Sequence, residues 1–255
     1  MEVFVVCNRK GGCGKTSTAT AMFSYLDCIA GKKTLFIDVD SQCNASYALG
    51  ADLSKPSLYD VLMGHVSIKD AMQAVPPHLF GAYVVCGADL LANIENGYDK
   101  PTISLKDALK TVANEIDYVV IDTAPALGYL TSMALLAADR IIIPATADVY
   151  NLQGIQGIVE LVAAINPKAK VEGILLTRFR ERLLINRRLK EMAGETAKDI
   201  GTKIFDTVIR DGVAISESAA MQKGLFDYDG KMLSNVAQDY ANFMEEVLEE
   251  DKGKE

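Results

Sequence analysis

The sequence predicts a single doubly wound α/β domain with a mostly parallel sheet, and two observations support this fold class. Short apolar runs without polar alternation recur along the chain, as in strands that are buried on both faces. Segments with helical spacing of apolar residues separate these runs, and this alternation is typical of βαβ units. We find no repeat or second domain in the 255 residues and therefore expect one domain over residues 1–255.

The expected elements follow in order along the chain. Strands are expected at residues 3–7, 33–38, 82–86, 118–122, 140–144 and 171–177. Helices are expected at residues 18–30, 105–113, 126–138, 151–165 and 185–200, with loops and short helices over 41–80 and an irregular segment at 87–103. A closing helix has an apolar stripe formed by Val236, Tyr240, Phe243, Met244 and Val247.

Composition excludes several classes of protein. Hydrophobic residues make up 49% of the chain and charged residues 24%, which are ordinary values for a globular domain. No apolar run approaches the roughly 18 residues that a membrane-spanning helix needs. The first strand follows Met1 almost directly, and we therefore expect no signal peptide. Five scattered cysteines without CxxC spacing indicate reduced thiols, so we expect a cytoplasmic protein.

A glycine-rich stretch between the first strand and the first helix predicts a phosphate-binding loop. Backbone N–H groups and a helix N-terminus favour an anion there, and a lysine reaches the outer phosphates. The hydroxyl of Thr16 is placed to bind Mg²⁺. Arg9 stands where the usual motif begins with glycine, and the extra Lys10 is better placed to reach a nucleotide in a facing subunit. The expected phosphate-binding residues are Lys10, Gly11, Gly12, Cys13, Gly14, Lys15, Thr16 and Ser17.

Three aspartates follow predicted strands at the same edge of the sheet. Asp122 ends an apolar strand and is expected to hold Mg²⁺ through a water, although it could instead cap the next helix. Asp38 and Asp40 follow a neighbouring strand, and one of them should face the γ-phosphate and orient the attacking water. Asp38 is nearer the strand and fits the outer shell of the metal. The alternative is that both acids only cap a loop.

These motifs resemble those of the ParA/MinD superfamily of deviant Walker A ATPases. Residues 9–17 resemble the KGGxGKT[ST] box, residues 38–44 resemble DxDPQGN, and residues 118–128 resemble YVIIDTPPSLG. The likeness continues through residues 138–144, 173–178 and 216–218, and so it covers nearly the whole chain. Ser41 and Cys43 depart from the family's proline and glycine.

The resemblance implies an ATP-driven switch that uses Mg²⁺. In the family, ATP binding forms a sandwich homodimer in which the lysine matching Lys10 crosses to the partner's phosphates. The residues matching Lys15, Thr16 and Asp40 bind phosphate, bind Mg²⁺ and serve hydrolysis, which is slow until a ParB-like centromere-binding protein stimulates it. Adenine contacts are expected at Ile209 and Arg210, although this chain has Ile209-Arg210-Asp211-Gly212 where the family often has Ile-Pro-Arg-Asn.

A basic segment favours DNA as the second ligand. Residues 178–190 contain six basic residues and one acid, in a chain with a net charge of −8. On the helix from Ile185, the set Ile185, Leu189, Met192, Thr196 and Ile200 is expected to face the core. The opposite face then presents basic residues without base-reading features, which predicts non-specific, nucleoid-associated binding, unless the face is merely solvated. The expected DNA-binding residues are Arg180, Arg182, Arg187, Arg188 and Lys190.

Other members of the superfamily act in different places, and the sequence argues against them. A MinD-like positioning ATPase is the main alternative, but the closing helix carries acids on its polar face, so we expect no stable membrane association. No cysteine follows Cys86, which argues against a bridged iron–sulfur cluster. A metabolic ATP-dependent ligase would need a substrate pocket for which we see no signature. With no helix-turn-helix extension expected at the N-terminus, the sequence favours a plasmid or chromosome partition ATPase.

Overall fold

The protein is built on one eight-stranded sheet, described by a computed structural model for residues 1–75, 81–147, 149–180, 184–229 and 234–252. The strand order is β3-β4-β2-β5-β1-β6-β7-β8, and all neighbours are parallel except the β3–β4 pair. The strands are β1 (Glu2–Val6), β2 (Thr34–Asp38), β3 (Gln73–Ala74), β4 (Ala82–Val85), β5 (Tyr118–Asp122), β6 (Arg140–Thr146), β7 (Lys170–Phe179) and β8 (Ile204–Arg210). The predicted fold class is confirmed.

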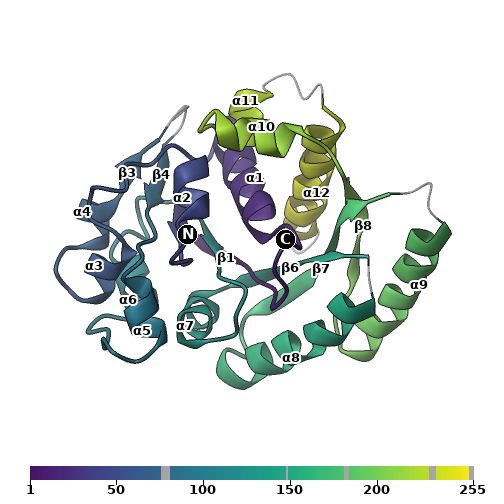
Figure 1. Ribbon diagram of the computed structural model, residues 1–255, viewed down its shortest axis with the longest axis horizontal. Helices are drawn as coiled ribbons and strands as arrows, with labels where there is room; N and C mark the ends of the chain where they lie inside the picture. Colours follow the sequence, from purple (N-terminus) through teal and green to yellow (C-terminus); the bar gives the residue numbers. More distant parts are fainter. Residues whose placement is uncertain (76–80, 148, 181–183, 230–233, 253–255) are drawn as a thin grey trace.

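Helices cover both faces of the sheet (Figure 1). One face carries α1 (Lys15–Cys28), α2 (Asn44–Ala48), α10 (Ala214–Ala220), α11 (Leu225–Tyr228) and α12 (Asn235–Lys252). The other carries α3 (Leu58–Leu62), α4 (Ile68–Ala71), α5 (Leu91–Glu95), α6 (Leu105–Lys110), α7 (Tyr129–Ala137), α8 (Val149–Ile165) and α9 (Leu184–Asp199). Alternate residues of each strand enter the two cores: in β1, Val3 and Val5 face one core while Phe4 and Val6 face the other. Burial on both sides explains why the strands lack polar alternation.

The parallel register brings the predicted functional segments to one edge of the sheet. Asp38 at the end of β2 lies directly opposite Asp122 at the end of β5, and Val6 at the end of β1 also pairs with Asp122. The glycine-rich loop continues from β1 into α1 at the same edge. The carboxyl ends of three adjacent strands therefore supply the loop and the two buried carboxylates, as expected for this class of sheet.

The structure adds elements in regions for which the sequence predicted none. β8, α10 and α11 lie between the helix expected at residues 185–200 and the closing helix, and α5 lies inside the segment predicted to be irregular. β8 was missed because Asp206 and Thr207 interrupt its apolar residues, although Phe205 and Ile209 are buried on one face. Helix α1 begins at Lys15 rather than Thr18, because the loop glycines lead straight into its first turn.

Two helices test the predicted apolar faces. In α12, all five residues of the predicted stripe are buried in the core, as expected for a helix packed on the domain. In α9 the predicted face is only partly right. Met192 is 49% exposed and Ala193 and Ala197 are buried instead, while Ile200 packs against the core. The side chains of Ile185 and Leu189 lie outside the described residues. The small alanines let the helix backbone approach the sheet more closely than methionine would. Within the described residues, no helix is long and apolar enough to cross a membrane.

Candidate nucleotide-binding site

The glycine-rich loop is held in shape by its own backbone and by two neighbouring strands. Gly12 and Gly14 adopt φ values of 72° and 87°, a left-handed region that a side chain would strain. The side-chain amide of Asn8 donates to the carbonyl of Pro144 at 2.7 Å, and its oxygen accepts from the N–H of Lys10 at 3.1 Å. Thr177 donates to the carbonyl of Cys13 at 2.8 Å. The loop therefore stands ready in front of the N-terminus of α1, where N–H groups favour an anion.

The two signature lysines occupy different environments. Lys15 is buried, and its Nζ donates to the carbonyl oxygen of Lys10 at 3.1 Å, so its ammonium lies under the loop. Lys10 is exposed on the outer side of the loop. The thiol of Cys13 donates to the same carbonyl at 3.1 Å, and burial raises the pKa of this thiol, which keeps it protonated. One lysine thus points inward from the loop, and the other stands at its surface.

Asp38 and Asp122 form a buried acidic pair beside Thr16. Asp38 accepts hydrogen bonds from the N–H and the hydroxyl of Ser46, at 2.9 and 2.6 Å, and from the N–H of Asp40 at 3.1 Å. Burial nevertheless raises the pKa of Asp38 to about 6. Burial also raises the pKa of Asp122 well above its usual value, and the neighbouring charge of Asp38 raises it further. Both shifts arise mainly because the carboxylates are buried, and the nearby ammonium of Lys15 offsets only part of the effect on Asp122.

This acidic pair fits a magnesium ion. The side chain of Thr16 hydrogen-bonds to Asp122, while the buried Oδ1 of Asp122 has no hydrogen-bond partner among the described residues. Buried carboxylate oxygens normally have a hydrogen-bond partner, so the unpaired Oδ1 of Asp122 is available to a metal ion. Together with the Thr16 hydroxyl it offers the oxygen ligands that Mg²⁺ prefers. Thr16, Asp38 and Asp122, the three residues predicted to serve the metal, are thereby brought together.

Asp40 lies at the edge of this group and is half-buried. Its carboxylate accepts from the N–H of Gln42 at 3.0 Å. A Cβ at Gly87 would lie 2.6 Å from the carbonyl oxygen of Asp40, and the N–H of Gly87 donates to the Ser46 hydroxyl at 3.0 Å. Sequence reasoning missed Ser46 and Gly87, although a glycine directly after the strand at 82–86 is a signal for close backbone approach.

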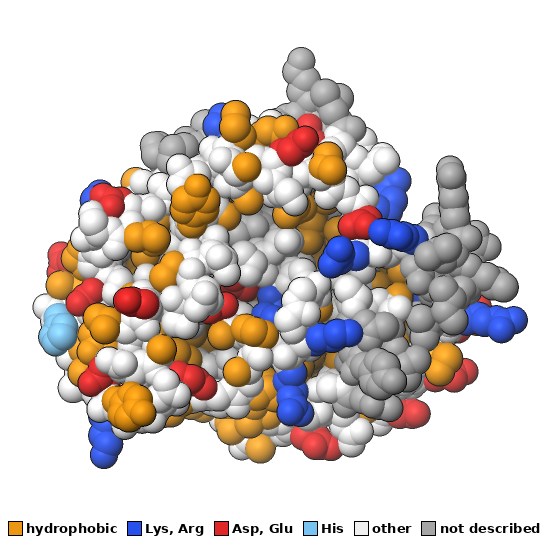
Figure 2. All heavy atoms as spheres, in the orientation of Figure 1, with side chains coloured by type: hydrophobic (Ala, Val, Ile, Leu, Met, Phe, Trp, Pro, Cys, Tyr) orange, Lys and Arg blue, Asp and Glu red, His pale blue; other side chains and the backbone are white. Residues whose placement is uncertain are grey.

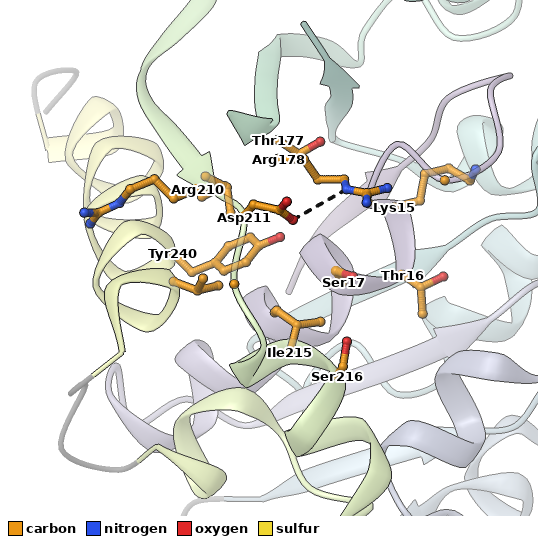
Figure 3. A pocket seen from close by; sticks show the side chains of 15 residues that line it. Lys15, Thr16, Ser17, Thr177, Arg178, Arg210, Asp211, Ile215, Ser216 and Tyr240 are labelled. Carbon is orange, nitrogen blue, oxygen red and sulfur yellow. Dashed lines mark ion pairs between the residues drawn. The ribbon is translucent and has the colours of Figure 1, made fainter. Parts of the chain in front are cut away.

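A cavity of about 430 Å³ runs from the glycine-rich loop to α12 (Figure 3). At one end it is lined by the loop and the start of α1, and we call this the phosphate end. The other end, which we call the base end, has an apolar wall formed by Ile209, Ile215, Val236 and Tyr240. The predicted adenine residues Ile209 and Arg210 do line the cavity, but the guanidinium of Arg210 points away from it toward α12.

An ion-pair group that the sequence did not predict lies beside the cavity. Asp211 accepts from Nη2 of Arg180 at 2.9 Å, and its Oδ1 is 3.7 Å from Nε of Arg178. The Arg180 hydrogen bond is the main reason why the pKa of Asp211 is lowered. Arg178 lines the cavity with a φ of 52°, which is rare for a residue with a side chain and is found often at functional sites.

The predicted DNA-binding residues are only partly described. Arg188 is exposed on α9, whereas Lys190 is half-buried and donates to the carbonyl of Asp206 at 3.0 Å, because it lies on the side of α9 that faces β8. Arg182 and the side chain of Arg187 lie outside the described residues. Figure 2 shows Lys and Arg side chains on the molecular surface near the carboxyl ends of β7 and β8.

Comparison with known proteins agrees with this geometry. Residues 1–173 match the family model described as an AAA domain. The chain is 32% identical to the chromosome partitioning protein ParA of Caulobacter vibrioides, covering 100% of this chain and 97% of that protein. It is also 32% identical to the sporulation initiation inhibitor protein Soj of Bacillus subtilis, with 96% and 98% covered. An ATP complex of Cyanothece McdA shares the fold, with a TM-score of 0.82 at 21% identity over 97% of this chain and 96% of that one. The chain therefore belongs to the ParA and Soj family of P-loop partition ATPases.

Proposed function

We propose that the protein is a nucleotide-gated, dimerising ATPase that binds DNA non-specifically and drives plasmid or chromosome partition. The observation that carries this proposal is the preformed loop with one buried and one exposed lysine, beside a buried acidic pair with an unpartnered oxygen. Relatives with full-length similarity that are named as partitioning proteins support the same function.

Hydrolysis needs little more than positioning and charge stabilisation. Loop N–H groups and Lys15 hold the phosphates, and Lys15 would exchange the Lys10 carbonyl for a phosphate oxygen. Thr16 and Asp122 would hold Mg²⁺ with Asp38 behind them, and the ion would neutralise charge on the β- and γ-phosphates. Asp40 is half-buried and adjacent, so it can meet solvent and orient the attacking water. Lys10, which is exposed at the loop surface, would reach a nucleotide in a second subunit, and dimerisation would then depend on ATP.

The basic segment at residues 178–190 is the proposed DNA contact. Exposed Arg188 and the remaining basic residues would bind phosphates, and a dimer would present two such segments. The paired carboxylate of Asp211 neutralises part of the charge of Arg180, so residues on α9 should contribute more. The apolar stripe of α12 is buried in the core and is not available to a membrane, which favours DNA over a MinD-like role. A ParB-like protein is the proposed activator.

Co-sedimentation tests this proposal. We expect the protein to pellet with plasmid DNA in the presence of ATP and Mg²⁺, less with ADP, and not with anionic liposomes in any state. Arg187→Ala/Arg188→Ala should weaken DNA binding and reduce the slope of log K against log salt by about 1 per lost phosphate contact per subunit. Lys32→Ala/Lys33→Ala removes the same charge from two exposed residues just before β2 and should leave the slope unchanged. An unaltered salt series in the arginine variant would refute this DNA contact, and liposome binding would favour the MinD-like alternative.

A further inference from the structure

We propose that Asp239 of α12 is a positioning residue that holds the base end of the nucleotide cavity in shape. The proposal rests on the proposed nucleotide-binding function and adds to it a residue that touches neither phosphate nor metal. Asp239 lines a second hollow, of about 930 Å³, between α9, β8 and α12. Arg210 lines both hollows, so it forms part of the wall between them.

The carboxylate of Asp239 holds Arg210 through both its backbone and its side chain. Oδ2 accepts from the N–H of Arg210 at 2.9 Å and from Nε at 2.9 Å, and Oδ1 accepts from Nη2 at 2.6 Å. The Asp239 side chain is only 9% exposed, whereas that of Arg210 is 43% exposed, so these charge-assisted bonds are shielded from water on the Asp239 side. Such a bidentate pair fixes the guanidinium plane, and the extra N–H bond fixes the backbone at the end of β8.

This contact belongs to a wider arrangement in which α12 covers the outer edge of the sheet. β8 is the last strand of the order, so its outer edge has no neighbouring strand within the described sheet. Seven residues after Asp239, Glu246 accepts from the N–H groups of Asp206 and Thr207 at 2.9 and 3.0 Å. Residues seven apart lie on the same helix face, so one face of α12 supplies acceptors that a neighbouring strand would otherwise provide.

Only the Asp239 end of this arrangement reaches the nucleotide cavity. Ile209, which precedes Arg210, lines the cavity. Val236 and Tyr240, which lie within one turn of Asp239 on α12, line it as well. The hydroxyl groups of Tyr240 and Thr18 are 3.2 Å apart, which ties α12 to α1 behind the glycine-rich loop. Glu246 binds the middle of β8, away from the residues that line this cavity. The two carboxylates therefore make similar bonds to the same strand but differ in what lies beside them.

The position of Arg210 also departs from the family pattern noted above. The pattern Ile-Pro-Arg-Asn has a proline after its isoleucine, which fixes its own φ and has no N–H to donate. Here Arg210 follows Ile209, and its N–H donates a hydrogen bond to the Asp239 carboxylate. The hydrogen bond from α12 thus restrains a backbone that has no proline ring to restrain it.

Calorimetric titration with two probes tests the proposal. Asp239→Asn should weaken ADP binding about tenfold, since charge-assisted bonds that preorganise the base end are lost. It should leave the affinity for inorganic tripolyphosphate within about twofold, because that probe contacts only the phosphate end. Glu246→Gln is the matched control, and it should leave both affinities within about twofold. Arg210→Met keeps the N–H bond and loses the guanidinium bonds, so it should give a smaller loss for ADP than Asp239→Asn.

Each outcome decides something. Wild-type ADP affinity in Asp239→Asn and Arg210→Met would overturn the proposal, as would equal losses for ADP and tripolyphosphate. An equal ADP loss in Glu246→Gln would assign the effect to general loosening of the β8 edge and would overturn it too. If Asp239→Asn does not fold, Arg210→Met with the same two probes decides. If the wild-type protein binds neither probe, the proposed nucleotide-binding function fails instead.

Discussion

The two ends of the nucleotide cavity are built in different ways. The phosphate end is formed mainly by one continuous segment, residues 8–17, whose backbone N–H groups, glycine conformations and lysine are proposed to bind phosphate. The base end is assembled from the end of β8, from α10 and from α12, and both α10 and α11 lie between β8 and α12 in sequence. A continuous motif such as the phosphate end can be recognised in the sequence. The base end depends on packing and on side-chain hydrogen bonds such as that between Arg210 and Asp239. The comparison predicts that each end can be weakened without the other.

The acidic pair beside the phosphate end should give the largest effect. Asp122→Asn should weaken Mg²⁺-dependent ADP binding roughly 10–100-fold, as expected when a metal-supporting carboxylate is lost. The same variant should raise the Tm of the nucleotide-free protein at pH 7.5, because it removes a buried charge whose Oδ1 has no hydrogen-bond partner among the described residues. Titration calorimetry with and without Mg²⁺, together with thermal melts, measures both effects.

The pH dependence of this gain has a definite sign. Burial raises the pKa of Asp122 in the folded protein above 3.8, so the folded state holds the proton more tightly than the unfolded state. The stability linked to this proton is complete below pH 3.8 and is lost as the pH rises through the folded pKa. The Tm difference between variant and wild type should therefore shrink as the pH is lowered toward 4. A difference that grows on acidification would mean that Asp122 is paired in the folded state.

Substitutions at two glycines should affect the base end and the phosphate end of the cavity differently, with smaller changes in affinity. A methyl group at Gly212 would lie 2.4 Å from Cγ2 of Val236, so Gly212→Ala should push α12 from the base end and cost about 1–3 kcal/mol. A methyl group at Gly12 meets nothing within 4 Å, and Gly12→Ala should cost only about 1 kcal/mol of backbone strain at φ 72°. We expect Gly212→Ala to weaken ADP several-fold but not tripolyphosphate, and Gly12→Ala to weaken both alike. If the two variants lose affinity for ADP and tripolyphosphate in the same proportion, the two ends of the cavity do not act independently.

The sequence predicted where the glycine-rich loop and the two buried aspartates lie, because their signals are local. Gly14, Lys15 and Thr16 stand between a strand and a helix in the order that the chemistry needs, and Asp38 and Asp122 end apolar strands that proved to be neighbours. The base end was less accessible. Ile209 and Arg210 were placed correctly at the cavity, but only through resemblance, and the outward turn of the Arg210 guanidinium depends on Asp239, which lies 29 residues further on.

The remaining differences have the same physical origin. The buried face of α9 was predicted from large apolar residues, but the close approach to the sheet selected Ala193 and Ala197 and left Met192 at the surface. Glu246 is one of the acids on the polar face of the closing helix, yet it accepts hydrogen bonds from two N–H groups of β8. Periodicity gives the face of a helix, while the acceptors needed by an edge strand become visible only when the strand is in place.

We propose that ATP, acting through Lys10 and Asp40, controls dimerisation. Sedimentation velocity with Mg²⁺ and ATP tests it most directly on wild type, Lys10→Ala and Asp40→Ala, with each variant's ADP affinity as the control for an intact loop. We predict a transient dimer for the wild type, a persistent dimer for Asp40→Ala because hydrolysis stops, and a monomer for Lys10→Ala at unchanged ADP affinity. A Lys10→Ala variant that dimerises like the wild type would refute the cross-subunit role of Lys10. An Asp40→Ala variant that hydrolyses ATP at the normal rate would refute the role of Asp40 in hydrolysis.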